Sequence, residues 1–286
     1  MTRRLFIFGL GYSGLAIARE AQAAGWSVAG TVRTAAKAEG LRARRLEAHV
    51  FDGTRPIDAA MLGHDAHVVC TIAPGTGGDP ALGATAAVLR GARWLGYLST
   101  TGVYGDRGGD WVDEDSPPRP TQPRSIERLA AEQAWQALGG ASGAAVTVFR
   151  LPGIYGPGRS ALDQVRSGMA RRIDKPGQVF SRIHVEDIAG AVMAALARGD
   201  AGGVFNVADD LPAPSGDVVA FACELLGVAV PPAIPWDEAE PTLSPMARSF
   251  YAESRRVRNE RMKRVLGVTL RYPTYREGLR AVLAAG

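Results

Sequence analysis

The chain is poor in cysteine and has no long apolar run. Its 286 residues include only two cysteines, Cys70 and Cys223, and each lies in an apolar stretch. We therefore expect both thiols to be buried and reduced, which excludes a disulfide-stapled secreted domain and favours a cytoplasmic protein. No segment approaches the ~18 consecutive apolar residues of a membrane span, so we expect no membrane association.

Lysine is also scarce, and the basic residues are spread along the chain. Lys37, Lys175 and Lys263 are the only lysines among 33 basic residues, and the formal net charge is +4. Because the arginines form no run and no nucleic-acid-reading motif accompanies them, we expect no nucleic-acid partner. His64 and His67 have metal-like spacing, but no acidic or cysteine cluster supports them, and we expect no metal site.

Short apolar runs alternate with amphipathic segments through the first 150 residues. This alternation predicts an α/β fold, a Rossmann-type doubly wound parallel sheet with helices on both faces. We expect strands at residues 5–8, 26–32, 48–51, 66–72, 94–99 and 145–150, and helices at 15–24, 34–45, 79–91 and 125–138.

After residue 150 the pattern loosens, and glycine and proline become frequent. We expect residues 1–155 to form the main domain, with 183–208 returning to it and adding a strand at 203–207. Residues 156–182 and 209–286 should form a small substrate-binding lobe over the carboxyl edge of the sheet, where open α/β folds bind ligands.

A glycine-rich turn follows the first expected strand. Gly9, Gly11 and Gly14 fit the pattern G-x-G-x-x-G between a strand and a helix. Gly9 permits a tight turn, Gly11 lets the backbone approach a pyrophosphate, and Gly14 lets the helix pack closely. Tyr12 and Ser13 open the helix, whose free N–H groups attract phosphates. The turn therefore predicts an NAD(P) site; the alternative is a structural turn without a ligand.

The end of the second expected strand indicates which dinucleotide binds. An acidic residue there would bind the ribose 2′-hydroxyl of NAD, but this chain has Arg33 and no acid. An arginine pairs with a 2′-phosphate, so NADP is favoured and NAD is less favoured. Asp52 either accepts from the adenine amino group or serves as a turn residue. We also expect cofactor contacts from the strand ends, at Ile72, Ala73, Pro74 and Pro152.

Several motifs follow the glycine-rich turn along the chain. They are Leu98–Gly105, Arg150–Gly158, Arg182–Ala189, Phe205–Val207 and the C-terminal residues around Gly267, Tyr272 and Gly278. Together with the turn, their order is similar to that of the extended short-chain dehydrogenase/reductase superfamily, in its NAD-dependent epimerase/dehydratase group, over nearly the whole chain. The resemblance implies a nicotinamide cofactor and, through the helix near 125–138, a homodimer.

The resemblance breaks at the family's catalytic Tyr-x-x-x-Lys pair. The matching positions carry Arg124 and Arg128, and no tyrosine lies between residues 105 and 154. Because arginine stays protonated, Arg124 cannot shuttle a proton, whereas Arg128 can still hold the nicotinamide ribose. The pattern resembles the superfamily's atypical branch, which keeps the cofactor turn but often lacks the tyrosine.

Three further residues are candidates for the chemistry. By the resemblance, Thr100 stands where the family keeps a hydroxyl that polarises the substrate, and Tyr104 or Tyr155 could replace the missing acid. We expect an NADP-linked oxidoreductase that acts on a small carbonyl- or hydroxyl-bearing substrate. The alternatives are a non-catalytic NADP-binding redox sensor or scaffold, and a nucleotide-sugar epimerase or dehydratase.

Overall fold

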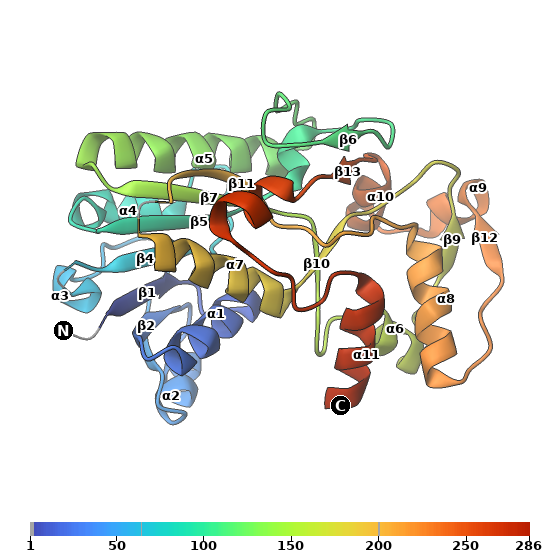
Figure 1. Cartoon of the computed structure of the whole chain (residues 1–286), viewed down its shortest axis with the longest axis horizontal. Coiled ribbons are helices and arrows are strands. Elements are labelled where there is room, and N and C mark those ends of the chain that lie inside the picture. The colour runs from blue at the N-terminus through green and yellow to red at the C-terminus, as the bar shows by residue number, and fades with distance from the viewer. Residues whose placement is uncertain (1–2, 64, 200) are drawn as a thin grey trace.

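A seven-stranded parallel sheet forms the centre of the protein. The computed structural model describes residues 3–63, 65–199 and 201–286, so His64 lies outside the described residues (Figure 1). The strand order is β11-β7-β5-β4-β1-β2-β3, and every neighbouring pair is parallel, which confirms the Rossmann-type doubly wound sheet. The strands are β1 (Arg4–Phe8), β2 (Ser27–Val32), β3 (Glu47–Val50), β4 (His67–Cys70), β5 (Trp94–Thr100), β7 (Ala145–Leu151) and β11 (Gly203–Asn206).

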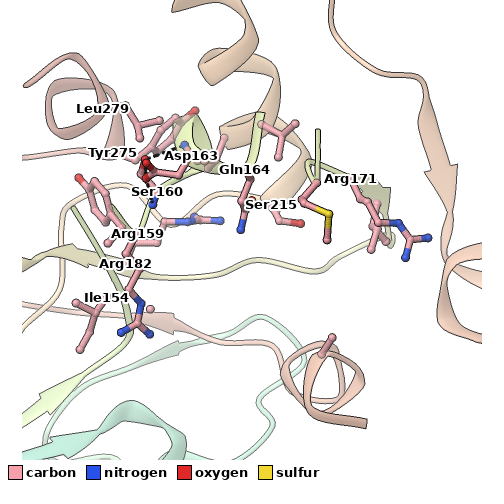
Figure 2. A pocket seen from close by; sticks show the side chains of 18 of the residues that line it. Ile154, Arg159, Ser160, Asp163, Gln164, Arg171, Arg182, Ser215, Tyr275 and Leu279 are labelled. Atoms are coloured by element: carbon pink, nitrogen blue, oxygen red, sulfur yellow. Dashed lines mark hydrogen bonds between the residues drawn. The ribbon is translucent and has the colours of Figure 1, made fainter. Parts of the chain in front are cut away.

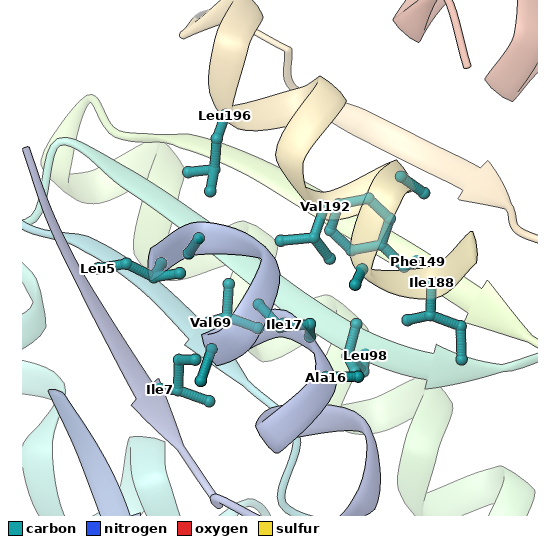
Figure 3. Close-up of a cluster of buried hydrophobic side chains, with 14 of the residues drawn as sticks. Leu5, Ile7, Ala16, Ile17, Val69, Leu98, Phe149, Ile188, Val192 and Leu196 are labelled. Carbon is teal, nitrogen blue, oxygen red and sulfur yellow. The ribbon is translucent and has the colours of Figure 1, made fainter. Parts of the chain in front are cut away.

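Helices cover both faces of this sheet. On β1, Leu5 and Ile7 point into one apolar core and Phe6 and Phe8 into another, because successive strand residues face opposite sides. The first core includes side chains of α1 (Tyr12–Ala23), α2 (Ala35–Arg42) and α7 (Val185–Arg198); Figure 3 shows Ile17 and Val192 over the sheet. The second includes side chains of α3 (Ala59–Leu62), α4 (Pro80–Leu89) and α5 (Pro123–Ser142).

A smaller lobe lies beyond the carboxyl ends of the strands (Figure 1). Its own core includes Tyr155, Leu162, Phe221, Tyr275 and Leu279. The lobe contains β8 (Gly153–Tyr155), α6 (Ala161–Arg166), β9 (Arg172–Asp174), β10 (Arg182–His184), α8 (Ser215–Leu226), β12 (Ala233–Pro235), α9 (Trp236–Ala239), η2 (Glu240–Thr242), α10 (Pro245–Tyr251) and α11 (Tyr275–Ala285). Two-stranded parallel ribbons join β8 to β10 and β9 to β12.

One part of the expected lobe belongs to the main domain instead. Strand β13 (Arg256–Val257) pairs with β6 (Trp111–Val112), which follows the short helix η1 (Thr101–Tyr104). The π-helical turn η3 (Met262–Leu266) then contributes Met262 and Leu266 to the core beneath α7. Within the expected lobe range 209–286, this segment therefore packs against the main core, because its apolar side chains contribute to that core. None of the described helices has the length and apolar character of a membrane span.

Candidate functional site

The glycine-rich turn joins β1 to α1, and each of its three positions requires or favours glycine for a different physical reason. Gly9 adopts φ +92°, a conformation that side chains other than glycine rarely take. A Cβ on Gly14 would lie 2.1 Å from the Gly9 carbonyl oxygen, so close packing of α1 requires glycine there. A Cβ on Gly11 would meet nothing within 4 Å. Gly11 therefore borders open space, where a phosphate can approach the backbone.

The start of α1 is an anion-binding end. Gly11 precedes the helix without a side-chain cap, and its first turn holds no acid. The N–H groups of Tyr12 and Ser13 are thus free of side-chain acceptors, and the helix dipole favours negative charge at this point. The Tyr12 hydroxyl donates to the Pro157 carbonyl at 3.2 Å, which ties this end of α1 to the loop that leads into the lobe.

A cavity of about 460 Å³ lies beside the turn, between the ends of β1, β2 and β3. Arg33 and Lys37 line it, and so does Asp52, whose carboxylate accepts from the backbone and hydroxyl of Thr54. Those hydrogen bonds lower the pKa of Asp52, so it is ionised at neutral pH. Sequence reasoning missed Lys37, although the Thr34 cap of α2 marks it as a first-turn residue that faces the same end. Two cations therefore border this cavity.

The remaining expected cofactor residues separate into two groups. Ile72 and Ala73 line the same cavity as Arg33, whereas Pro152 lines a second cavity at the ends of β5 and β7. Pro74 is not among the residues that line either cavity. These cavities follow the carboxyl edge of the sheet, where an open α/β fold binds ligands.

The second cavity has a volume of about 440 Å³ and contains hydroxyl groups. Thr100 Oγ1 accepts from the Gly102 N–H at 3.1 Å, which leaves its proton free to donate into the cavity. Thr101 and Ser125 line the same space, and Ser125 is buried in the first turn of α5. Sequence reasoning missed Ser125, for which the one available signal was its place next to Arg124.

The two arginines of α5 differ in position. Arg124 lines the cavity of Thr100, with its guanidinium 4.5 Å from the Phe250 ring centre and a nitrogen 2.9 Å from the Met246 sulfur of α10. Arg128 does not line that cavity; it donates to the Leu98 carbonyl and lies 5.7 Å from the Tyr97 ring centre. Helix α5 contains neither tyrosine nor lysine.

The two candidate tyrosines do not face the hydroxyl groups. Tyr104 is fully buried, and its hydroxyl donates to the Asn206 side chain at 2.8 Å. Tyr155 donates to the Thr274 carbonyl at 3.4 Å and lines a cavity in the lobe rather than the cavity of Thr100. Burial raises the pKa of both phenols. Both hydroxyls bond to partners other than Thr100, and the role of either tyrosine as the acid stays a prediction.

The lobe cavity continues from the cavity of Thr100 and measures about 730 Å³. Both spaces share Ile154, Arg159, Arg182, Ser215 and Tyr251 as wall residues. In Figure 2 the side chains of Arg159 and Gln164 extend into this cavity. The two cavities thus form one continuous region, which can hold a larger ligand than the cavity of Thr100 alone.

A buried ion pair supports the strand ends behind these cavities. Arg150 on β7 donates twice to Glu132 on α5, with an Nη2 to Oε2 distance of 2.8 Å. The Ser99 hydroxyl also donates to Glu132, so β5, β7 and α5 share one network. Because both charges are buried and hydrogen-bonded, the network fixes the position of the neighbouring Thr100.

One family model and one curated relative match parts of the chain. The model of the NAD dependent epimerase/dehydratase family matches residues 81–208. A 3-diazoavenalumate denitrifying reductase from Streptomyces sp is 29% identical over 205 residues, covering 68% of this chain and 66% of that protein.

Solved structures agree over the full length. A functionally unknown conserved protein from Silicibacter pomeroyi DSS is 48% identical, with a TM-score of 0.86 and 99% of each chain covered. The UDP-glucose 4-epimerase of Thermus thermophilus, solved as a complex with NAD, has a TM-score of 0.76 at 20% identity and 98% coverage of each chain, and shares the fold. Together with the glycine-rich turn and the sheet order, the match over residues 81–208 shows that this part of the chain is similar to the NAD-dependent epimerase/dehydratase family, and the solved structures show the shared fold.

Proposed function

We propose that this protein is an NADPH-dependent reductase of a small carbonyl-bearing substrate. The observation that carries the proposal is the pair of cations, Arg33 and Lys37, on the cavity beside the glycine-rich turn. No acidic residue ends β2, where NAD-specific folds keep a carboxylate for the ribose 2′-hydroxyl. A 2′-phosphate gains charge-assisted hydrogen bonds from two cations, which favours NADP over NAD.

The proposed chemistry takes place beside Thr100. When bound, the reduced nicotinamide supplies a hydride to the carbonyl carbon. Thr100 and Ser125 donate hydrogen bonds to the carbonyl oxygen, and the Arg124 cation stabilises the negative charge that develops on it. Because arginine keeps its protons, we propose that water delivers the proton that completes the alcohol.

The Streptomyces relative supports a reductive role, since its name describes a reductase. The enzymatic test is NADPH consumption with aldehydes, ketones and nucleotide sugars, measured after NADPH binding has been established by fluorescence titration. Thr100→Val should lower kcat by about 10²-fold, the usual cost of removing one donor to a developing oxyanion. Arg198→Gln, an exposed change at the far end of α7, serves as the control. An unchanged rate in Thr100→Val would remove Thr100 from the mechanism.

A second candidate is a non-catalytic NADP-binding sensor or scaffold. The absence of tyrosine from α5, together with the hydrogen bonds that the hydroxyls of Tyr104 and Tyr155 make to other partners, favours it. Tight NADPH binding without consumption of any compound in the screen supports this candidate over the reductase. Turnover of a nucleotide sugar without net NADPH loss would instead support an epimerase or dehydratase.

A further inference from the structure

The two joined cavities have a strongly basic lining. The charged side chains around the cavity of Thr100 and the lobe cavity are five arginines and two acids. These are Arg124, Arg159, Arg171, Arg182 and Arg255, with Asp163 and Glu253. A region of this charge attracts anions, provided that the two acids do not neutralise the arginines.

Within the described residues, neither acid forms an ion pair with Arg159 or Arg182. Glu253 pairs with Arg255 at 2.7 Å. Asp163 accepts from the Ser160 N–H at 2.8 Å and from its hydroxyl at 2.6 Å, in the capping box that begins α6. Across residues 3–63, 65–199 and 201–286, no carboxylate lies within ion-pairing distance of Arg159 or Arg182.

Arg182 is fixed in the wall that the two cavities share. Its Nη1 donates to the Phe180 carbonyl at 2.8 Å and to the Ala213 carbonyl at 2.9 Å. Its Nε and Nη2 have no partner among the described side chains and backbone groups, and neither atom is sealed inside the protein. The guanidinium therefore has donors left for a ligand in the cavity.

Asp209 has the largest electrostatic effect of any acid on the pKa of Arg182, but it does not supply a countercharge. Burial raises the pKa of Asp209 to about 8, so this carboxyl is mostly protonated at neutral pH. Burial also lowers the pKa of Arg182, although an arginine remains cationic at neutral pH. A cation withdrawn from bulk water without a paired anion is costly, and a bound anion would relieve that cost.

The rest of the lobe cavity is largely apolar. Ile154, Val218, Leu243, Tyr275 and Leu279 contribute to its walls. Its volume of about 730 Å³ suits a whole small molecule rather than an inorganic ion. We propose that the joined cavities bind a substrate that carries an oxyanion, a carboxylate or a phosphate, on an apolar body, and that Arg182 and Arg159 hold the oxyanion. This inference rests on the proposed reductase, because it names the substrate class of the same site.

The test is direct binding to the protein saturated with NADPH, so that the cofactor's own phosphates already occupy their sites. Isothermal titration would compare 4-phenylbutyrate with its neutral amide, and phenyl phosphate as the phosphate arm. We expect one anion to bind at least ~10-fold more tightly than the amide, the scale of a charge-assisted bidentate pair. The anion that binds more tightly shows whether the site prefers a carboxylate or a phosphate.

Variants then locate the binding. Arg182→Met should weaken the anion at least ~10-fold and leave NADPH affinity unchanged, whereas Arg198→Gln should change neither. Equal binding of amide and anion, no binding of either anion, or unchanged anion affinity in Arg182→Met would overturn the inference. If Arg182→Met does not fold, the comparison of acid and amide on the wild-type protein decides. The binding experiment does not depend on turnover, so the two proposals can fail separately. Carbonyl reduction without a preference for anions would contradict only the anion site. Anion binding without carbonyl reduction would contradict only the reductase.

Discussion

At the scale of single residues, cations rather than a tyrosine dominate the candidate site. Arg33 and Lys37 border the cavity beside the glycine-rich turn, and Arg124 lines the same cavity as Thr100 and Ser125. An arginine stabilises negative charge without exchanging its proton. The site is therefore better suited to holding an anionic transition state than to general acid catalysis.

The glycines of the turn give a matched pair of variants. Gly11→Val places its side chain in open space, so we expect an unchanged thermal midpoint and at least ~10-fold weaker NADPH binding. Gly14→Ala forces a Cβ against the Gly9 carbonyl and should lower the free energy of unfolding by about 3 kcal/mol. Thermal melts and fluorescence titration measure the two effects. Equal loss of stability in both variants would contradict the separate roles.

Asp209 makes the stability of the protein depend on pH. Burial raises its pKa from 3.8 to about 8, against the opposing effects of the Leu211 N–H and Arg182. The folded state therefore binds this proton more tightly than the unfolded state, and the stabilisation disappears as pH rises from about 4 to about 8.

The variant Asp209→Asn stays neutral throughout and should escape this loss. Its free energy of unfolding relative to the wild type should rise by at least about 1 kcal/mol between about pH 5 and about pH 8.5. Urea unfolding at the two pH values measures the difference, in which the contributions of other groups cancel. A difference that does not change with pH would show that Asp209 ionises normally in the folded protein.

At the scale of elements, the long strands and helices could be predicted from sequence and the short ones could not. Strand β5 and helix α5 each lie within a residue or a few of the expected ranges, because their apolar periodicity runs over several residues. The ribbons β6–β13, β8–β10 and β9–β12 have two or three residues per strand, too few to carry a period. Their positions depend on tertiary pairing, and so does the packing of η3 against the main core.

Helix α5 is held to the sheet by the buried pair of Glu132 and Arg150. Glu132→Gln keeps the shape but leaves the Arg150 cation without a countercharge, so we expect a loss of about 3 kcal/mol in the free energy of unfolding. Glu127→Gln, on the same helix and without an ion pair in the described structure, should change stability little. Chemical denaturation measures the stability of both variants. Similar midpoints for the two would show that the pair of Glu132 and Arg150 does not stabilise the fold.

At the scale of the whole molecule, α4 and α5 leave small and apolar side chains on the surface. Ile126 is 51% exposed, and Ala130, Ala134 and Ala137 follow it along one exposed side of α5. We propose that this face forms a homodimer. Ala134→Arg should then convert a dimer into a folded monomer in light scattering, with NADPH affinity retained. A wild-type protein that is already monomeric at high concentration would contradict the proposal.

Some residues of the candidate site could be predicted from the sequence, and others could not. The glycine turn, Arg33 and Thr100 could be identified because each stands at a fixed distance from a strand end. Lys37, Ser125 and Arg182 could not be assigned to cavities, since their neighbours come from segments far apart in the chain. The lobe brings those segments together without any periodic pattern.

The preference between NADPH and NADH decides whether the cavity beside the glycine-rich turn binds a 2′-phosphate. Fluorescence titration of both cofactors would use the wild-type protein and the double variant Arg33→Ser/Lys37→Ser. We expect the wild type to bind NADPH at least ~10-fold more tightly than NADH, and the double variant to lose that preference while keeping its NADH affinity. Equal binding of the two cofactors by the wild type, or tighter binding of NADH, would contradict the assignment of this site to NADP.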